Sequence, residues 1–207
     1  MSSFSNSKLF LKRVKRILTH RILGPYKWHK SKYAPPSPYA IKLKILLSNA
    51  IPKAPWIETG TYLGETTKVL SKNFPLVFTF EPSYIHFQYV KSRFKSNQEV
   101  TVINSASETG LEQVLNGLNG ELNMYLDGHY SGDNTFEGSK VTPIREELKI
   151  IEKYLNKFSK LFVAIDDFRV FGSQDGHYPT KFSLVEFCER NSLEWKVEHD
   201  IFMFKKN

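Results

Sequence analysis

The sequence predicts an α/β fold in which a mostly parallel, doubly wound sheet of seven strands ends in an antiparallel hairpin strand. From Tyr39 onward, short apolar runs alternate with longer amphipathic stretches. Helices between strands imply right-handed crossovers to parallel neighbours and a sheet covered on both faces. At the end of the chain, only three residues separate the apolar runs 193–197 and 201–205. That gap permits a hairpin and excludes a helical crossover.

The individual elements follow from the length and period of each apolar segment. Short runs of aliphatic and aromatic residues predict strands at 56–57, 76–80, 100–103, 122–126, 161–165, 193–197 and 201–205. Longer stretches that mix apolar and charged residues predict helices at 39–49, 65–73, 84–95, 111–115, 143–158 and 181–190.

Charge is unevenly distributed along the 207 residues. Residues 1–57 contain twelve Lys and Arg and no Asp or Glu, whereas the other 150 residues carry 17 basic and 21 acidic side chains. We therefore expect residues 1–38 to form a basic N-terminal arm and a proline-rich linker, and residues 39–207 to form one domain. The acidic balance of that domain argues against nucleic acid as a partner.

Within the arm, residues 8–23 place apolar side chains at helical spacing with Lys and Arg between them. This basic amphipathic helix has three alternative roles. The lack of acidic residues would suit a mitochondrial-type presequence, against which the many lysines argue. The other two roles are contacts of the mature chain. The helix packs on the body or on a second subunit of a homo-oligomer, or it docks on an anionic membrane surface. No apolar run is long enough to cross a bilayer, and the single cysteine, Cys188, is compatible with a reducing compartment. These features predict a cytoplasmic protein, which docking by the helix would hold at the periphery of a membrane.

The first expected strand leads into a glycine-containing loop, Glu58-Thr-Gly-Thr-Tyr-Leu-Gly64. Gly60 and Gly64 permit positive φ and a close approach of the backbone to a ligand. The dinucleotide pattern Gly-x-Gly-x-x-Gly is absent, and an acidic residue before the glycines suits a cationic amino group better than a pyrophosphate. The residues expected to bind a cofactor here are Glu58, Thr59, Gly60, Gly64 and Thr66.

Two further strand ends offer groups for an adenosine. Glu81 follows the second strand, where a carboxylate can accept hydrogen bonds from both ribose hydroxyls. The alternative for Glu81 is a solvated residue at the start of a helix. Ser105 and Ala106 follow the third strand and are expected near the adenine, with Ser107 as a helix N-cap.

The motifs ETGTYLG, FEP, YLDG and IDD, with the terminal hairpin, resemble class I S-adenosylmethionine (SAM) dependent methyltransferases over about residues 40–207. Those enzymes have a Rossmann-like fold. The segments YLDGHYSG and FVAIDDFRVFG are more narrowly similar to the macrocin-type, magnesium-dependent O-methyltransferases, which act on sugar hydroxyls of natural products and glycans. The resemblance implies SAM as the cofactor and a glycan or another small molecule as the acceptor.

Asp127 ends the fourth expected strand, and Asp166 and Asp167 end the fifth. Adjacent parallel strands lie about 4.8 Å apart, so the three carboxylates can converge, and a divalent cation would relieve their repulsion. The alternative is that Asp127 contacts the cofactor, Asp166 caps a turn and Asp167 pairs with Arg169. In the resembled family these three positions hold the metal. The resemblance therefore favours Mg²⁺, or another divalent cation, at Asp127, Asp166 and Asp167.

His129 lies two residues beyond Asp127 and therefore close to a bound acceptor. Histidine has an ordinary pKa of about 6.5 and can take a proton from a hydroxyl at neutral pH. The resembled family often has an aspartate at this position. We assign catalytic roles to His129 and Asp127.

Together these residues predict a SAM-dependent, metal-assisted O-methyltransferase that modifies a hydroxyl of a sugar, a glycan or a glycosylated small molecule. Two other classes are alternatives. One is a different Rossmann-like nucleotide-binding enzyme, acting on nucleotide sugars or with NAD, and the missing dinucleotide pattern argues against it. The other is a non-enzymatic, membrane-associated binding module, against which the intact acidic residues argue.

Overall fold

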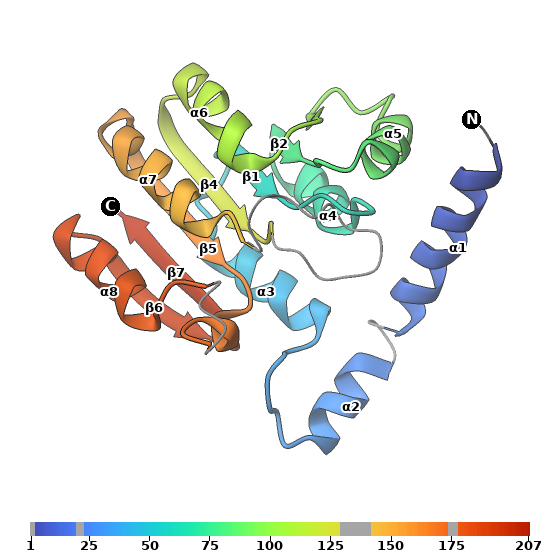
Figure 1. Ribbon diagram of the computed structural model, residues 1–207, viewed down its shortest axis with the longest axis horizontal. Helices are drawn as coiled ribbons and strands as arrows, with labels where there is room; N and C mark the ends of the chain where they lie inside the picture. Colours follow the sequence, from blue (N-terminus) through green and yellow to red (C-terminus); the bar gives the residue numbers. More distant parts are fainter. Residues whose placement is uncertain (1–2, 20–22, 129–141, 174–177) are drawn as a thin grey trace.

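A computed structural model describes residues 3–19, 23–128, 142–173 and 178–207, with side chains described from Ser7 onward. Within these residues lies a seven-stranded sheet in the order β3-β2-β1-β4-β5-β7-β6 (Figure 1). Its strands are β1 (Trp56–Thr59), β2 (Val77–Phe80), β3 (Val100–Ile103), β4 (Gly120–Leu126), β5 (Phe158–Ile165), β6 (Glu194–Glu198) and β7 (Ile201–Lys206). Strands β1 to β5 are parallel, and β7 runs antiparallel to both β5 and β6. The expected Rossmann-like fold with its terminal hairpin is confirmed.

Helices cover both faces of the sheet. They are α3 (Tyr39–Asn49), α4 (Glu65–Asn73), α5 (Tyr84–Arg93), α6 (Ser107–Gly117), α7 (Ile144–Tyr154) and α8 (Lys181–Arg190), with short 3₁₀ turns at Leu155–Lys157 and Phe168–Val170. Buried side chains of α6, α7 and α8 belong to one hydrophobic cluster, whereas those of α3 and α4 belong to a second and those of α5 to a third. This division is the doubly wound arrangement that the alternation of strands and helices predicts.

Strand β4 shows how the two faces are built. Leu122, Met124 and Leu126 are buried in the cluster of α6, α7 and α8, whereas Tyr125 is buried in the cluster of α3 and α4. Alternate residues of a strand point to opposite faces, so both sets are buried when helices cover both sides, and the polar Asn123 on the second face bonds to the backbone of Ile51.

The expected boundaries differ from the observed ones mainly in two helices. Helix α6 begins at Ser107, four residues before the expected start, because the segment Ser107–Gly110 has no apolar residue to reveal its helical period. Ala106 occupies the N-cap position that we expected for Ser107. Helix α7 ends at Tyr154, and β5 begins at Phe158, which the sequence pattern placed in the helix. Leu155 and Phe158 continue the apolar spacing of the helix, but they enter the same core from a 3₁₀ turn and a strand.

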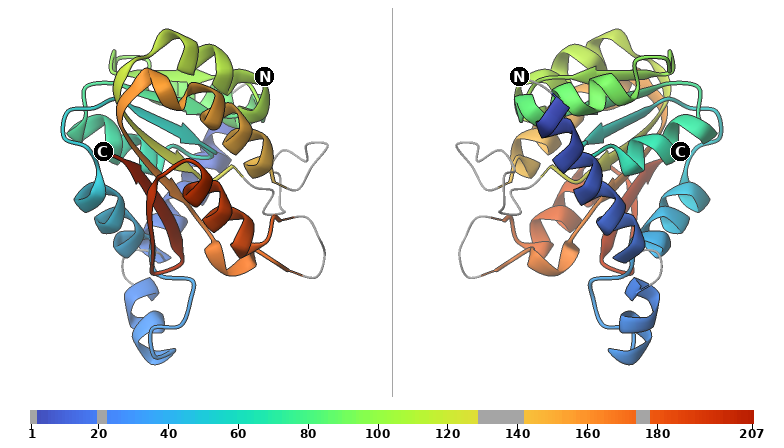
Figure 2. Two further views of the ribbon diagram at one scale, coloured as in Figure 1. Left: turned by 90° about the vertical axis from the view of Figure 1, so that its left-hand side faces the viewer. Right: turned by 90° about the vertical axis from the view of Figure 1, so that its right-hand side faces the viewer.

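Two further helices precede α3 in the part of the chain that the structure describes. Helix α1 (Ser3–Leu18) crosses beside α4 and α5 (Figure 2), and α2 (Gly24–Lys30) follows it. The segment from Gly24 was expected to be a linker, but Pro25 in the first turn of α2 is compatible with a helix because its missing N–H would have no intrahelical partner there. Among the described residues, no helix combines the length and the apolar character that a membrane span requires.

Candidate functional site

The carboxyl ends of β1 and β4 lie where the winding of the sheet changes direction. From β1 the chain proceeds outward to β2 and β3, and it then returns to β4 on the other side of β1. Such a switch point leaves a crevice between the loops that follow the two strands. Thr59 is in register with Leu126, and Leu126 with Ile165. The residues that come next, Gly60, Asp127 and Asp166, therefore share one edge of the sheet.

Both glycines of the loop after β1 are required by the fold. Gly60 has a φ of 88°, and a Cβ at this position would lie 2.5 Å from the carbonyl oxygen of Asp127. Gly64 has a φ of 73° and immediately precedes α4, where a Cβ would lie 2.8 Å from the ring of Phe94. Glycine removes both conflicts, and the loop brings the positive end of the α4 dipole to the edge.

Glu58 and Thr59 point to opposite faces of the sheet. Glu58 is buried, and its Oε2 accepts hydrogen bonds from Thr67 Oγ1 at 2.6 Å and Thr79 Oγ1 at 2.7 Å. Burial raises the pKa of Glu58 to about 7, although these two hydrogen bonds oppose the shift. The Thr59 side chain is hydrogen bonded to Glu147 of α7. Contact of either side chain with a cofactor stays a prediction, because both are engaged within the protein.

Glu81 holds the glycine loop in place. Its Oε2 accepts the backbone N–H of Tyr62 at 2.7 Å, and its Oε1 accepts that of Ser83 at 3.0 Å. Burial raises the pKa of Glu81 to about 7, although both hydrogen bonds lower it. A carboxylate has about four acceptor positions, so this one retains capacity for ribose hydroxyls.

Ser105 and Ala106 lie after β3, at the same edge of the sheet. Ser105 Oγ is 2.8 Å from Thr109 Oγ1 and donates to the carbonyl of Ala106 at 2.9 Å. These contacts shape the turn into α6. A role of Ser105 and Ala106 beside an adenine stays a prediction.

The acidic cluster at the ends of β4 and β5 contains a lysine that the sequence pattern did not indicate. Lys42 Nζ of α3 lies 2.6 and 2.7 Å from the two carboxylate oxygens of Asp166 and 3.2 Å from Oδ1 of Asp167. Tyr125 donates its hydroxyl to Asp166 Oδ2 at 2.6 Å, and Arg169 pairs with Asp167 at 2.6 Å. The expected pair of Asp167 with Arg169 is therefore present.

These contacts also determine the charges in the cluster. Burial alone would lower the pKa of Lys42, but Asp166 and Asp167 raise it overall, so Lys42 remains a cation. For Asp166, burial and then the charge of Asp127 raise the pKa to about 6, and Lys42 opposes this shift. Burial therefore changes the pKa of Asp166 more than the ion pair with Lys42 does.

The predicted metal site does not fit this arrangement. Among the described residues, no three His, Cys, Asp or Glu side chains are placed to share a metal ion. The physical reason is the ammonium group of Lys42, which contacts both oxygens of Asp166 and supplies the positive charge that the carboxylates require. A divalent ion bound by Asp127, Asp166 and Asp167 would have to displace it.

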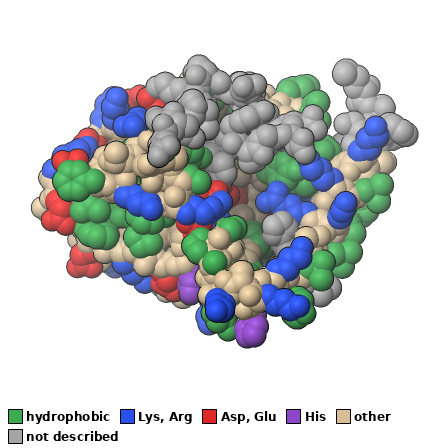
Figure 3. Space-filling view, turned by 60° about the horizontal axis from the view of Figure 1, so that its bottom comes forward, with side chains coloured by type: hydrophobic (Ala, Val, Ile, Leu, Met, Phe, Trp, Pro, Cys, Tyr) green, Lys and Arg blue, Asp and Glu red, His purple; other side chains and the backbone are tan. Residues whose placement is uncertain are grey.

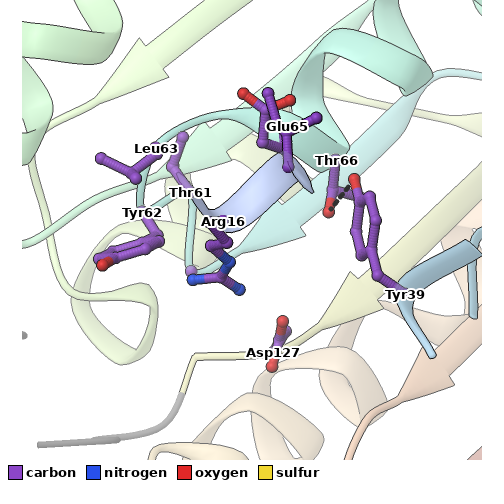
Figure 4. A pocket seen from close by; sticks show the side chains of 10 residues that line it. Arg16, Tyr39, Thr61, Tyr62, Leu63, Glu65, Thr66 and Asp127 are labelled. Atoms are coloured by element: carbon purple, nitrogen blue, oxygen red, sulfur yellow. Dashed lines mark hydrogen bonds between the residues drawn. The ribbon is translucent and has the colours of Figure 1, made fainter. Parts of the chain in front are cut away.

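A pocket opens between the glycine loop, Asp127 and two N-terminal helices (Figure 4). Arg16 of α1 points into the space between Tyr62 and Asp127. On the opposite side, Tyr39 of α3 lies with its hydroxyl 3.3 Å from Thr66 Oγ1. The lining residues are Arg16, Ile17, Tyr39, Gly60, Thr61, Tyr62, Leu63, Glu65, Thr66 and Asp127. The pocket therefore contains Gly60, Thr66 and Asp127 from the predicted set and offers charges of both signs.

Helix α1 is held against this pocket by charged contacts. Arg13 is hydrogen bonded to Glu65, which also pairs with Arg93 at 2.9 Å. The guanidinium carbon of Arg16 lies 4.8 Å from the centre of the Tyr62 ring, within the range of a cation–π contact. The N-terminal arm thus packs on the body, one of the alternatives expected for it, and supplies part of the pocket wall.

Arg16, Tyr39 and Lys42 were missed by sequence reasoning. Tyr39 and Lys42 stand three positions apart in a helix, which places them on one face. That spacing was a usable signal for α3, whereas nothing local to residues 8–23 indicates which side of α1 meets the loop. The candidate base His129 lies outside the described residues.

Comparisons with known proteins support the fold. No protein-family model and no curated protein sequence matches this chain. A candidate rRNA-methylase from Clostridium thermocellum covers 80% of this chain and 94% of its own, with a TM-score of 0.54 and 11% identity. The N-methyltransferase NodS from Bradyrhizobium japonicum covers 80% and 91%, with a TM-score of 0.51 and 10% identity. The chain therefore has the fold of class I SAM-dependent methyltransferases.

Proposed function

We propose that this protein is a SAM-dependent methyltransferase whose pocket at the switch point holds the cofactor. The observation that carries the proposal is the presence of Arg16 and Asp127 in one pocket, next to the glycine loop of a methyltransferase fold. The methionyl end of SAM carries an ammonium and a carboxylate. Asp127 suits the first group and Arg16 the second, because charge-assisted hydrogen bonds are the stronger kind.

The rest of the cofactor is assigned to the neighbouring strand ends. Glu81 would accept the ribose hydroxyls, and the turn at Ser105 and Ala106 would lie beside the adenine. Gly60 and Thr66 would contact the cofactor from the side of the glycine loop. When bound, SAM supplies a methyl group that its sulfonium makes electrophilic.

We further propose that the acceptor is a hydroxyl of a sugar, glycan or glycosylated small molecule. The similarity of YLDGHYSG and FVAIDDFRVFG to sugar O-methyltransferases supports this acceptor class. Asp127 would orient the acceptor hydroxyl and His129 would take its proton, since an alcohol is a weak nucleophile until its proton is removed.

We propose no metal-assisted step, although those motifs led us to expect one. Lys42 neutralises Asp166 in the geometry described above, and a metal ion would require that contact to break. The cation beside the acceptor site is therefore assigned to Lys42.

Calorimetry with SAM, S-adenosylhomocysteine and NAD tests the first part of the proposal. We expect both SAM compounds to bind and NAD not to bind. Arg16→Met should weaken both SAM compounds by about tenfold, the effect of one charge-assisted hydrogen bond. Lys15→Met, which removes a charge from an exposed neighbour on the same helix, should leave their affinity unchanged. NAD binding without SAM binding would favour the oxidoreductase alternative.

Transfer of labelled methyl groups from SAM tests the acceptor. Products from a glycan or glycosylated small molecule that resist base, as methyl ethers do, would support O-methylation of a hydroxyl. Labelling of RNA or of amine acceptors in place of glycans would contradict the acceptor class while leaving the methyltransferase assignment intact.

A further inference from the structure

Helix α1 has an inner face that packs on the body and an exposed outer face, whose Phe10 and Leu11 also border a hollow that Tyr89 of α5 lines. On the inner side, Leu9 packs against the cluster of Leu63, Tyr89, Val90 and Phe94, and Arg13 bonds to Glu65. The helix is therefore fixed in orientation by its own protein. Because these contacts prevent the helix from rotating about its axis, they also determine which residues form its outer face.

The outer face is apolar. Leu11, Val14 and Leu18 recur at helical spacing and are 66%, 37% and 54% exposed, and Phe10 at the margin is 52% exposed. Figure 3 shows hydrophobic side chains along the right-hand side, where α1 lies in Figure 1, with Lys and Arg side chains beside them. Contiguous exposed apolar side chains on a helix mark an interaction surface, since isolated ones need no explanation.

The surroundings of this apolar face are cationic. Lys8 and Lys15 are exposed on α1, and Lys27 and Lys30 are exposed on α2. Residues 1–57, which contain both helices, have no acidic side chain at all. The partner must therefore accept aliphatic side chains and, around them, a dense positive charge.

A second copy of the chain, a nucleic acid and an acidic bilayer meet these two requirements to different degrees. A second copy of the chain would bring an equally basic arm, and the like charges would repel. Nucleic acid would pair with the lysines, but its bases and phosphates offer no apolar layer for Leu11, Val14 and Leu18. A bilayer with acidic headgroups meets both requirements, because it places an apolar layer directly beneath a negative surface.

We propose that α1 docks on an anionic membrane by its outer face, with Leu11, Val14 and Leu18 inserted among the lipids and the lysines of α1 and α2 at the headgroups. The helix lies in the plane of the interface. Its inner face keeps its contacts with the body, so the pocket beside Arg16 would lie close to the membrane surface. The docking does not depend on the proposed methyltransferase activity.

Sedimentation of the full-length chain with lipid vesicles tests this proposal. Vesicles of phosphatidylcholine mixed with phosphatidylglycerol should bind the chain, vesicles of phosphatidylcholine alone should bind it weakly, and added salt should release it. The double variant Leu11→Gln, Leu18→Gln should lower the affinity by about tenfold or more, since each leucine side chain loses its apolar burial.

The matched control replaces two equally exposed apolar residues elsewhere, Ile85→Gln and Phe182→Gln, which are 61% and 66% exposed. The control should bind vesicles like the unaltered chain, and circular dichroism should show that all variants are folded. Equal vesicle binding by the two double variants would overturn the proposal. So would binding of single-stranded RNA or self-association at the same face without any binding to acidic vesicles.

Discussion

At the scale of single residues, the site differs from its expected form mainly in which cation neutralises the acidic groups. Asp127, Asp166 and Asp167 were predictable because each follows a strand, and the ends of parallel strands meet at one edge. For Lys42 the sequence offers only its spacing from Tyr39, which places both on one face of α3, because its partner Asp166 lies 124 residues later in the chain. A pattern of acids at strand ends predicts the need for a cation but not its identity.

The first residue-scale prediction concerns Glu81. Glu81→Gln should weaken SAM binding by about tenfold, since a ribose hydroxyl would bond to a neutral amide in place of a carboxylate. Isothermal calorimetry measures the change, and Glu121→Gln, a partly exposed residue at the start of β4, is the control. An unchanged dissociation constant for Glu81→Gln would refute the assignment of the ribose to Glu81.

The second concerns Lys42. Breaking a buried ion pair on one side leaves an uncompensated charge, so Lys42→Met should lower the free energy of unfolding by about 3–5 kcal/mol. Lys44→Met, on the exposed side of the same helix, should have little effect. Denaturant unfolding of the three proteins gives the comparison.

A test on the unaltered enzyme shows whether the cation in the acidic cluster is Lys42 or a metal ion. With Lys42 as the cation, methyl transfer by the unaltered enzyme should be the same in EDTA and in Mg²⁺. Loss of turnover in EDTA and recovery with Mg²⁺ would instead restore the metal site predicted from the sequence.

At the scale of elements, the sequence predicted best those helices and strands whose own apolar residues mark where they begin and end. Helices α3, α4 and α8 and strand β3 have the predicted bounds. The start of α6 was missed because its first turn is polar and is fixed by contacts with other elements. Ser107, in that turn, is hydrogen bonded to the buried Glu147 of α7. Such a contact between two elements has no signature in the sequence of either one.

Glu147 carries a prediction for stability. Burial raises its pKa to about 7, although hydrogen bonds with Ser107 and Thr59 oppose the shift. The folded protein therefore holds this proton more tightly than the unfolded chain. The contribution of Glu147 to the free energy of unfolding is fully present below 4.5, the pKa of the unfolded chain. It is lost as the pH rises through about 7, the pKa in the folded protein.

Glu147→Gln removes the buried charge and retains a group that can accept hydrogen bonds. We expect this variant to be more stable than the unaltered protein by about 1–3 kcal/mol at pH 8 and of similar stability at pH 5. Denaturant unfolding at the two pH values measures the difference. A stability change that is the same at both pH values would show that Glu147 does not titrate between them.

At the scale of the whole molecule, the N-terminal arm and the domain are joined through the pocket beside the glycine loop, where we propose that the cofactor binds. In the sequence, the arm differs from the domain in its positive charge, and prolines lie between the two before α3. In the structure Arg13 and Arg16 of α1 reach the glycine loop, where they meet Glu65 and Tyr62. Composition revealed that the arm is basic and amphipathic, but only the fold reveals that its inner side closes the pocket.

This arrangement leads to a prediction that compares two cations of α1. Arg13 faces the loop and is 17% exposed, whereas Lys15 lies on the exposed side. Arg13→Met removes the contact that holds α1 beside Glu65, so SAM affinity should fall by about threefold to tenfold, the usual effect of one hydrogen bond to a charged group that is partly exposed. Lys15→Met removes the same charge from the arm but leaves that contact intact, so calorimetry should show unchanged SAM affinity. Arg13 lies on the inner face beside Glu65, whereas Lys15 is exposed, so binding to acidic vesicles should weaken for Lys15→Met and change less for Arg13→Met. Equal SAM affinities would mean that α1 and the cofactor pocket act independently, whereas a loss confined to Arg13→Met would show that the inner face of the arm serves the cofactor site.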